Sequence, residues 1–134
     1  MRYHNILHID DDEDDQEIFF TALEQVSKEI SCISLNDASD ALQKLSTNEI
    51  IPDLICMDLN MPGMNGLQFL GEIQKNAILQ HIPVIVFSTS SNFLTIELTK
   101  QLGAFDFITK PGNYNELVNI LTHILSLQHK KVNL

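Results

Sequence analysis

The chain has 134 residues, 44% of them hydrophobic, and its 18 acidic and 8 basic side chains give a formal charge of −10 at pH 7. This length and apolar content suit a single domain with a buried core, and the negative charge argues against nucleic acid or acidic membrane surfaces as partners. The sequence contains neither a signal-peptide pattern nor an apolar run long enough to cross a bilayer. We therefore expect one cytoplasmic domain.

Short apolar runs bounded by polar or turn residues recur along the chain and predict buried strands. Five such runs cover residues 6–9, 30–35, 54–57, 84–87 and 104–108. In the second run, Ser31 and Ser34 stand among the apolar residues. A half-polar strand of this kind suits the edge of a sheet.

Each predicted strand is followed by a segment with helical spacing of its apolar residues, and a residue suited to cap a helix precedes that segment. The expected helix starts are Asp12 or Glu13, Asn36 or Asp37, Asn65, Ser90 or Ser91, and Asn113 with Glu116 in a capping-box pattern. The first helix is expected to reach about Lys28, the fourth to stop at Gly103, and the fifth to reach about Gln128. The faces expected in the core are Ile18, Phe19, Ala22, Leu23 and Val26 in the first helix, and Leu94, Leu98 and Leu102 in the fourth.

The two cysteines, Cys32 and Cys56, both lie in apolar runs. Because neither a CxxC pair nor a histidine at ligand spacing accompanies them, they are expected to be buried packing thiols in a reducing compartment. The five histidines share no spacing with the acids, so none is interpreted as a phosphohistidine.

Five strand–helix units in strict alternation predict an α/β protein with a parallel sheet and helices on both faces. In such a sheet, ligands bind beside the carboxyl ends of the strands, where the strand order reverses. The residues at these ends are Asp10 and Asp11, Asn36 and Asp37, Asp58, Ser88 and Thr89, and Thr109 and Lys110.

The third predicted strand leads directly into Asp58 and then into a Pro-Gly turn. If the first and third strands are neighbours, Asp10, Asp11 and Asp58 converge, and three like charges at close range call for a cation. Oxygen ligands on a rigid sheet suit Mg²⁺ or a similar hard ion. With Lys110 as a second positive charge, Asp58 becomes a candidate phosphoryl acceptor, and the Ser88 hydroxyl a candidate donor to a phosphoryl oxygen.

Simpler interpretations stand beside this one. Asp58 alone could cap the turn that follows it. A calcium loop in the first acidic cluster is rejected, because it needs glycine and glutamate where Asp15 and Thr21 stand. The acids Asp14, Asp15 and Glu17 are interpreted as a solvated helix face.

The features that occur in order at the predicted strand ends are Asp10-Asp11, Asp58 with Met61-Pro62-Gly63 and Gly66, Ser88, and Lys110-Pro111. In this combination, from about residue 5 to residue 128, the chain resembles the receiver domain of bacterial two-component response regulators. The resemblance implies a flavodoxin-like (βα)5 fold, a doubly wound sheet with strand order 2-1-3-4-5, as in single-domain chemotaxis regulators.

The resemblance also implies a role for each site residue. Asp58 would be the phosphoacceptor. Mg²⁺ would be bound by Asp11 directly, by Asp10 less directly, by Asp58, and by the backbone carbonyl of Asn60. Lys110 would pair with the phosphoryl group.

A conformational switch is implied as well, in which Ser88 moves toward the phosphoryl oxygen and Phe107 turns inward. Pro111 and Gly66 would be structural, with a cis bond before Pro111. Phe107 stands where tyrosine is commoner, and Thr89 where a smaller residue is usual. By the same resemblance, Asn60 and Ser90 occupy positions that tune the rate of dephosphorylation.

The expected function is to accept a phosphoryl group from a phosphohistidine of a sensor kinase or histidine phosphotransfer protein. The expected activity is limited to self-catalysed phosphorylation and dephosphorylation, so the chain is not expected to be an enzyme. Because the chain ends about six residues after the last predicted helix, no output domain is expected. The signal would then pass to a protein target through the fourth helix, fifth strand and fifth helix, or by onward phosphoryl transfer.

Three other functions stay open at this stage. A receiver-like adaptor that works without phosphorylation stays open, although the intact set of acids argues against it. A free-standing aspartyl-phosphate phosphatase fits less well, since Asn60 lacks an acid–base group. A flavodoxin-like nucleotide binder fits worst, because three aspartates after the first strand would repel a phosphate.

Overall fold

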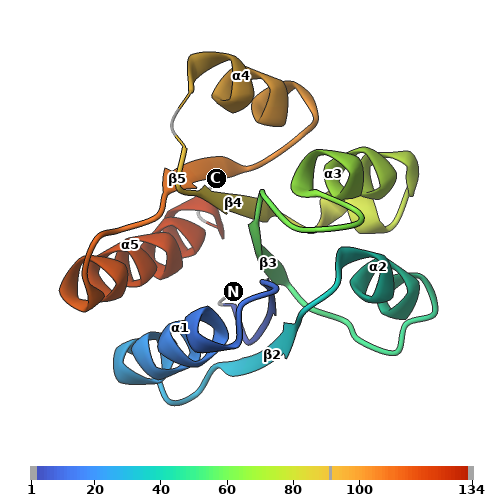
Figure 1. Ribbon diagram of the computed structural model, residues 1–134. Coiled ribbons are helices and arrows are strands. Elements are labelled where there is room, and N and C mark those ends of the chain that lie inside the picture. Colours follow the sequence, from blue (N-terminus) through green and yellow to red (C-terminus); the bar gives the residue numbers. More distant parts are fainter. Residues whose placement is uncertain (1–2, 91, 133–134) are drawn as a thin grey trace.

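The computed structural model describes residues 3–90 and 92–132, with residues 127–132 described by their backbone alone. Its five strands form one parallel sheet in the order β2-β1-β3-β4-β5 (Figure 1), which confirms the predicted fold class and strand order. The strands are β1 (Asn5–Ile9), β2 (Ser31–Leu35), β3 (Leu54–Asp58), β4 (Val84–Ser88) and β5 (Asp106–Thr109). The helices are α1 (Glu13–Val26), α2 (Ala38–Ser46), α3 (Gly66–Lys75), the 3-10 turn η1 (Leu79–His81), α4 (Phe93–Gln101) and α5 (Tyr114–Val132).

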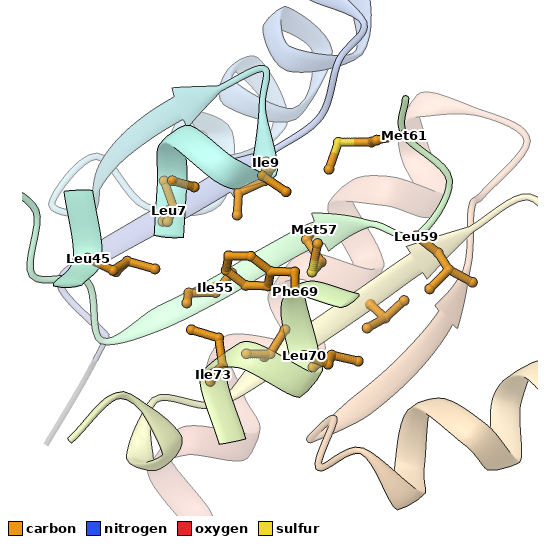
Figure 2. Packing of buried hydrophobic residues seen from close by; sticks show 14 of the residues in the cluster. Leu7, Ile9, Leu45, Ile55, Met57, Leu59, Met61, Phe69, Leu70 and Ile73 are labelled. Atoms are coloured by element: carbon orange, nitrogen blue, oxygen red, sulfur yellow. The ribbon is translucent and has the colours of Figure 1, made fainter. Parts of the chain in front are cut away.

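The helices cover both faces of the sheet. The pair α1 and α5 packs on one face, and the pair α2 and α3 packs on the other (Figure 1). Side chains alternate along a strand, so β3 sends Ile55 and Met57 toward α2 and α3, and Leu54 and Cys56 toward α1 and α5. Figure 2 shows Phe69 of α3 lying against the first of these two sets. Burial on both faces explains why the central strand is an unbroken apolar run.

The partly exposed strand β2 lies at the edge of the sheet, as its mixed sequence predicts. Cys56 is buried as predicted, whereas Cys32 in β2 is only partly buried, and both are free thiols. Burial raises the pKa of both thiols, that of Cys32 to about 11. None of the described helices combines the length and apolarity needed to span a membrane.

Helix α1 buries a narrower face than its sequence predicts. Phe19, Ala22 and Leu23 are buried, but Ile18 is 47% exposed. The prediction for Ile18 is wrong because this position of the helix faces a cavity between α1 and α5 instead of the sheet. The helix also ends at Val26, two residues before the predicted end.

Helix α4 departs furthest from its prediction. Asn92 caps it, because the Asn92 side chain accepts hydrogen bonds from the backbone N–H groups of Leu94 and Thr95, so Ser90 is not the cap. The alternative cap, Ser91, lies outside the described residues. Leu94 is 74% exposed and Leu98 43% exposed, which contradicts their predicted burial.

The buried face of α4 differs from the predicted one because Thr99, and not Leu94 or Leu98, faces inward. Its side chain is fully buried, and its hydroxyl donates to the Ile96 carbonyl at 2.8 Å, so the polar group is satisfied within the helix. A hydroxyl that bonds its own helix backbone can occupy an interior position that a hydrophobic pattern assigns to leucine.

The turn after α4 explains the shifted start of β5. Gly103 has φ +95°, and its N–H donates to the Lys100 carbonyl, while the Ala104 N–H donates to the Thr99 carbonyl. This pair of bonds is a Schellman motif, which confirms Gly103 as the stop of the helix. Because Ala104 still belongs to this motif, β5 begins at Asp106 instead of residue 104.

Candidate functional site

Three aspartates meet at the carboxyl ends of β1 and β3. The two strands are neighbours, with Ile9 opposite Met57, so Asp10 and Asp58 follow side by side. One carboxylate oxygen from each of Asp10, Asp11 and Asp58 lies within 4.8 Å of the others. Asp10 is 2% exposed and Asp58 is 9% exposed, while Asp11 faces solvent.

Backbone groups orient the two buried carboxylates. The Asp12 N–H donates to Asp10 Oδ1 at 3.0 Å, and the Asn60 N–H donates to Asp58 Oδ1 at 3.3 Å. Burial raises the pKa of Asp10, an effect that the Asp12 N–H and Lys110 oppose and that Asp58 and Asp15 reinforce. The carboxylates of this cluster therefore repel one another, as expected for like charges that share a small space.

Lys110 comes from the end of β5 and supplies the positive charge. Its backbone N–H donates to the Ser88 carbonyl at 2.7 Å, which connects Lys110 to the neighbouring strand. Its Nζ lies 3.3 Å from Asp58 Oδ2, 3.4 Å from Asp10 Oδ2 and 3.2 Å from Asp15 Oδ2. Burial alone would lower the pKa of Lys110, but the carboxylates of Asp10, Asp58 and Asp15 outweigh burial and raise it.

The donor set of this cluster fits a hard divalent cation. Carboxylate oxygens on a rigid sheet are the ligands that Mg²⁺ prefers. Asp10, Asp11 and Asp58 place three such oxygens together, and one lysine does not balance them. The structure thus holds an acidic pocket with the composition of a metal site.

Ser88 ends β4, the strand next to the one that carries Asp58, and Phe107 lies within β5 opposite Val86. The Ser88 side chain is fully buried, and its Oγ accepts a hydrogen bond from the Ser90 N–H at 3.1 Å. Phe107 is partly buried against the α2–α3 side of the core. The structure therefore brings Asp10, Asp58 and Lys110 into direct contact, whereas the Ser88 hydroxyl is engaged by its own loop.

Two residues expected to be structural have different outcomes. At Gly66, a Cβ atom would lie 2.9 Å from Leu59 Cα, and the Gly66 N–H donates to the Leu59 carbonyl, so a side chain does not fit there.

The resemblance implies a cis bond before Pro111, but no peptide bond in the described chain is cis. Prolyl bonds prefer trans by about 0.5–1 kcal/mol unless tertiary contacts reverse the preference. The expected cis bond is therefore corrected to trans.

A cavity of about 350 Å³ opens next to the acidic pocket, between α1 and α5. Its walls include Ile18 and Phe19 from α1, Phe87 from β4 and Leu117 from α5. His8 of β1 also lines it, stacked on Phe19 with ring centroids 3.8 Å apart. Asp10, Asp15, Asp58 and Lys110 also line this cavity, so it has both apolar and charged walls.

Sequence reasoning missed two residues of this site. The acidic run predicts a solvated side chain for Asp15, yet Asp15 pairs with Lys110. The available signal is its position in the first turn of α1, three residues after the cap Asp12, whose side chain accepts from the Asp15 N–H. His8 is 5% exposed and its Nε2 lies 4.0 Å from Asp10 Oδ2. Its position two residues before Asp10 in the first strand points to the same face of the sheet.

Fold and site together define a receiver-type signalling domain, with acidic residues and a lysine at the carboxyl edge of a 2-1-3-4-5 sheet. The sequence profile of the response regulator receiver domain matches residues 6–122, so the chain belongs to this family.

Solved structures agree with this assignment. The phosphorylated cyanobacterial phytochrome response regulator RcpA superposes with a TM-score of 0.83 at 31% identity, covering 91% of each chain. The Mn²⁺-bound response regulator Rcp1 superposes with a TM-score of 0.80 at 30% identity, covering 90% of this chain and 91% of the other.

Curated relatives are longer proteins. Regulatory protein AtoC of Escherichia coli is 31% identical over 94% of this chain, which corresponds to 26% of its own length. A protein-glutamate methylesterase/protein-glutamine glutaminase of Treponema denticola is 44% identical over 61% of this chain and 21% of its own length. The chain thus spans about a quarter or less of these relatives, and the resemblance to them concerns the receiver part.

Proposed function

We propose that this receiver domain accepts a phosphoryl group on Asp58, with Mg²⁺ as its metal, from a phosphohistidine of a sensor kinase or phosphotransfer protein. The observation that carries the proposal is the position of Asp58 Oδ2, which lies 3.3 Å from Lys110 Nζ beside two further aspartates. This position suits a nucleophile, and Asp58 is 9% exposed, so solvent reaches it only in part.

The transfer itself requires positioning and charge neutralisation. An oxygen of Asp58 attacks phosphorus, the phosphorus–nitrogen bond breaks, and the imidazole of the donor leaves with its electron pair. Lys110 donates to the oxygens on which negative charge accumulates. Asp10, Asp11, Asp58 and the Asn60 carbonyl would hold Mg²⁺, which would supply the remaining positive charge.

The response to phosphorylation runs through Ser88. Its Oγ now accepts a hydrogen bond from the Ser90 N–H, and we propose that it turns to donate to a phosphoryl oxygen, which draws the β4–α4 loop inward. Phe107 then moves into the space that the loop leaves. Phosphorylation would shift the equilibrium toward this conformation, which the unphosphorylated protein already samples beside the one described here. Because Phe107 lacks a hydroxyl, this switch acts through packing alone.

The output surface is proposed on α4, β5 and α5. Phe93 and Leu94 at the start of α4 are 70% and 74% exposed, and Leu98 lies one helical turn further on the same helix. Exposed large apolar side chains that cluster on one helix mark a contact surface for another protein. The signal would pass by contact with a downstream protein there, or by onward phosphoryl transfer.

Mobility on a phosphate-affinity gel after incubation with acetyl phosphate tests the proposal. We expect a shifted band for the wild type that requires Mg²⁺ and disappears in Asp58→Asn. Asp14→Asn is the matched control, because Asp14 is an exposed acid of α1 and should leave the shift intact.

A short-lived phosphorylated form would escape the gel, so beryllofluoride binding is measured in parallel. A wild type that neither shifts nor binds beryllofluoride contradicts the proposal and favours an adaptor that works without phosphorylation. A shift that persists in Asp58→Asn contradicts the choice of acceptor.

A further inference from the structure

Lys110 contacts three carboxylates, and one of them is outside the acidic triad. Asp10 and Asp58 belong to the group of oxygens that lie within 4.8 Å of one another, whereas Asp15 does not. Yet the Asp15 contact, at 3.2 Å from Lys110 Nζ, is the shortest of the three. Asp15 is therefore a partner of the lysine without being a member of the metal-binding set.

The start of α1 holds Asp15 in this position. The Asp15 N–H donates to the side chain of the cap residue Asp12 at 3.0 Å. In the same turn, Gln16 Nε2 donates to the Asp10 carbonyl at 2.6 Å, which fastens α1 to the end of β1. The side chain of Asp15 is 45% exposed, so the pairing with Lys110 is not a consequence of burial.

The pairing uses the donor capacity of Lys110. An ammonium group has three N–H donors, and Asp10, Asp15 and Asp58 supply three carboxylate acceptors to them. A phosphoryl group on Asp58 needs one or more of these donors. Because a single ammonium group contacts both Asp15 and Asp58, the Asp15 carboxylate also lies close enough to repel negative charge that is added to Asp58.

We propose that Asp15 is a positioning residue that holds Lys110 in the unphosphorylated site and competes with the phosphoryl group for it. The inference rests on the proposed phosphoacceptor function and deepens it, because it names a residue that sets how strongly the site retains a phosphoryl group. Asp15 acts through Lys110 and is not assigned any contact with the metal.

Beryllofluoride titration of the full chain at saturating Mg²⁺, followed by ¹⁹F NMR, tests this competition. Asp15→Asn keeps the shape of the side chain and removes its charge, so we expect about three- to fivefold tighter binding than the wild type, the upper part of the range expected for one partly exposed ion pair. Asp15→Glu retains the carboxylate and should return the affinity toward that of the wild type.

Asp14→Asn is the matched control, because it removes the same charge from the same helical turn without touching a partner of Lys110. We expect its affinity for beryllofluoride to stay within about twofold of the wild type, since a surface charge at this distance is screened. Mn²⁺ binding followed by EPR should be equal in Asp14→Asn and Asp15→Asn, because neither residue is a member of the triad. A purely structural role of Asp15 would not separate the two affinities in this way.

The outcomes separate the two proposals. If the wild type binds beryllofluoride and Asp15→Asn binds no more tightly than Asp14→Asn, or more weakly than the wild type, the role of Asp15 is overturned and the phosphoacceptor function stands. If the wild type does not bind beryllofluoride at all, the phosphoacceptor function is overturned and the role of Asp15 falls with it.

Discussion

Several acidic residues of the site are arranged around one positive charge, the ammonium group of Lys110. Lys110 is shared by Asp10, Asp15 and Asp58, and burial of Asp10 raises the pKa of that carboxyl although the lysine is near. Breaking such a partly buried cluster by removing its cation leaves carboxylates without a partner. The lysine therefore stabilises the unphosphorylated site as well as serving the proposed phosphoryl group.

His8 shows the opposite effect of burial, on a base. Burial in the first place, and Lys110 in the second, lower the pKa of His8 from 6.5 to about 3. Its Nδ1 has no hydrogen-bond partner among the residues that the structure describes. The neutral imidazole with its proton on Nε2 suits these surroundings, because the bare Nδ1 is then the unpaired atom and Nε2 faces Asp10.

The lowered pKa of His8 predicts a loss of stability in acid. The unfolded chain binds a proton on His8 below pH 6.5, while the folded chain binds it only near pH 3, so the contribution to stability is complete above pH 6.5 and declines between pH 6.5 and 3. At pH 5 the decline for this one residue is about 2 kcal/mol.

Urea unfolding at pH 5 and pH 8 measures this effect. We expect the free energy of unfolding to fall between the two pH values by about 2 kcal/mol more in the wild type than in His8→Leu. Other groups titrate alike in both proteins, so the comparison isolates His8. An identical fall in both proteins would mean that His8 is protonated in the folded state.

Among the elements, α4 and its ends differ most from a regular amphipathic helix. Thr99 occupies the buried position, Leu94 and Leu98 face outward, and Gly103 reverses the chain into β5. The strand β5 in turn carries Phe107 and ends beside Lys110. This short region thus joins the acidic pocket to the exposed apolar face of α4, which is the physical basis for proposing it as the path of the signal.

The turn at Gly103 makes a testable contribution to stability. Its positive φ disfavours any side chain, and a Cβ atom there would meet the side chain of Gln74. Gly103→Ala is therefore expected to lower the free energy of unfolding by about 1–2 kcal/mol.

Gly71 within α3 is the matched control for this substitution. A Cβ atom there would meet open space, and alanine favours the helix more than glycine does. Gly71→Ala should raise the free energy of unfolding by about 0.5–1 kcal/mol. Urea unfolding of both variants checks the opposite signs, and equal effects would contradict the role assigned to the turn.

At the scale of the whole molecule, the proposed metal links the site to global stability. The chain carries a formal charge of −10, and three of its acids meet at one edge of the sheet. A cation that binds these acids only in the folded chain stabilises that state by mass action.

We expect Mg²⁺ to raise the unfolding temperature of the wild type. Above the dissociation constant, each tenfold increase in Mg²⁺ should add about 1.4 kcal/mol to the free energy of unfolding. Asp11→Asn should abolish most of this dependence, whereas Asp14→Asn should retain it. Calorimetry at graded Mg²⁺ in constant ionic strength measures the effect, and a wild type that is indifferent to Mg²⁺ would contradict the metal assignment.

Much of the secondary structure of this protein can be predicted from local sequence, for a physical reason. Apolar runs, cap residues and Gly103 act within a few residues of themselves, so the alternation of strands and helices, the edge strand and the end of α4 follow from short-range patterns. A chain that alternates in this way also has few possible topologies. The order of the residues along the chain is therefore enough to place Asp10, Asp58 and Lys110 at strand ends, while the strand order that brings them together came from the resemblance to receiver domains.

The tertiary structure alone decided what depends on packing between distant elements. The outward turn of Ile18 and Leu94 and the inward turn of Thr99 are set by neighbours that no local pattern names. The same holds for the pairing of Asp15 with Lys110, which are 95 positions apart in the sequence. Sequence periodicity assigns a residue to a face of its own helix, but the partner across that face is chosen by how the helices and the sheet meet.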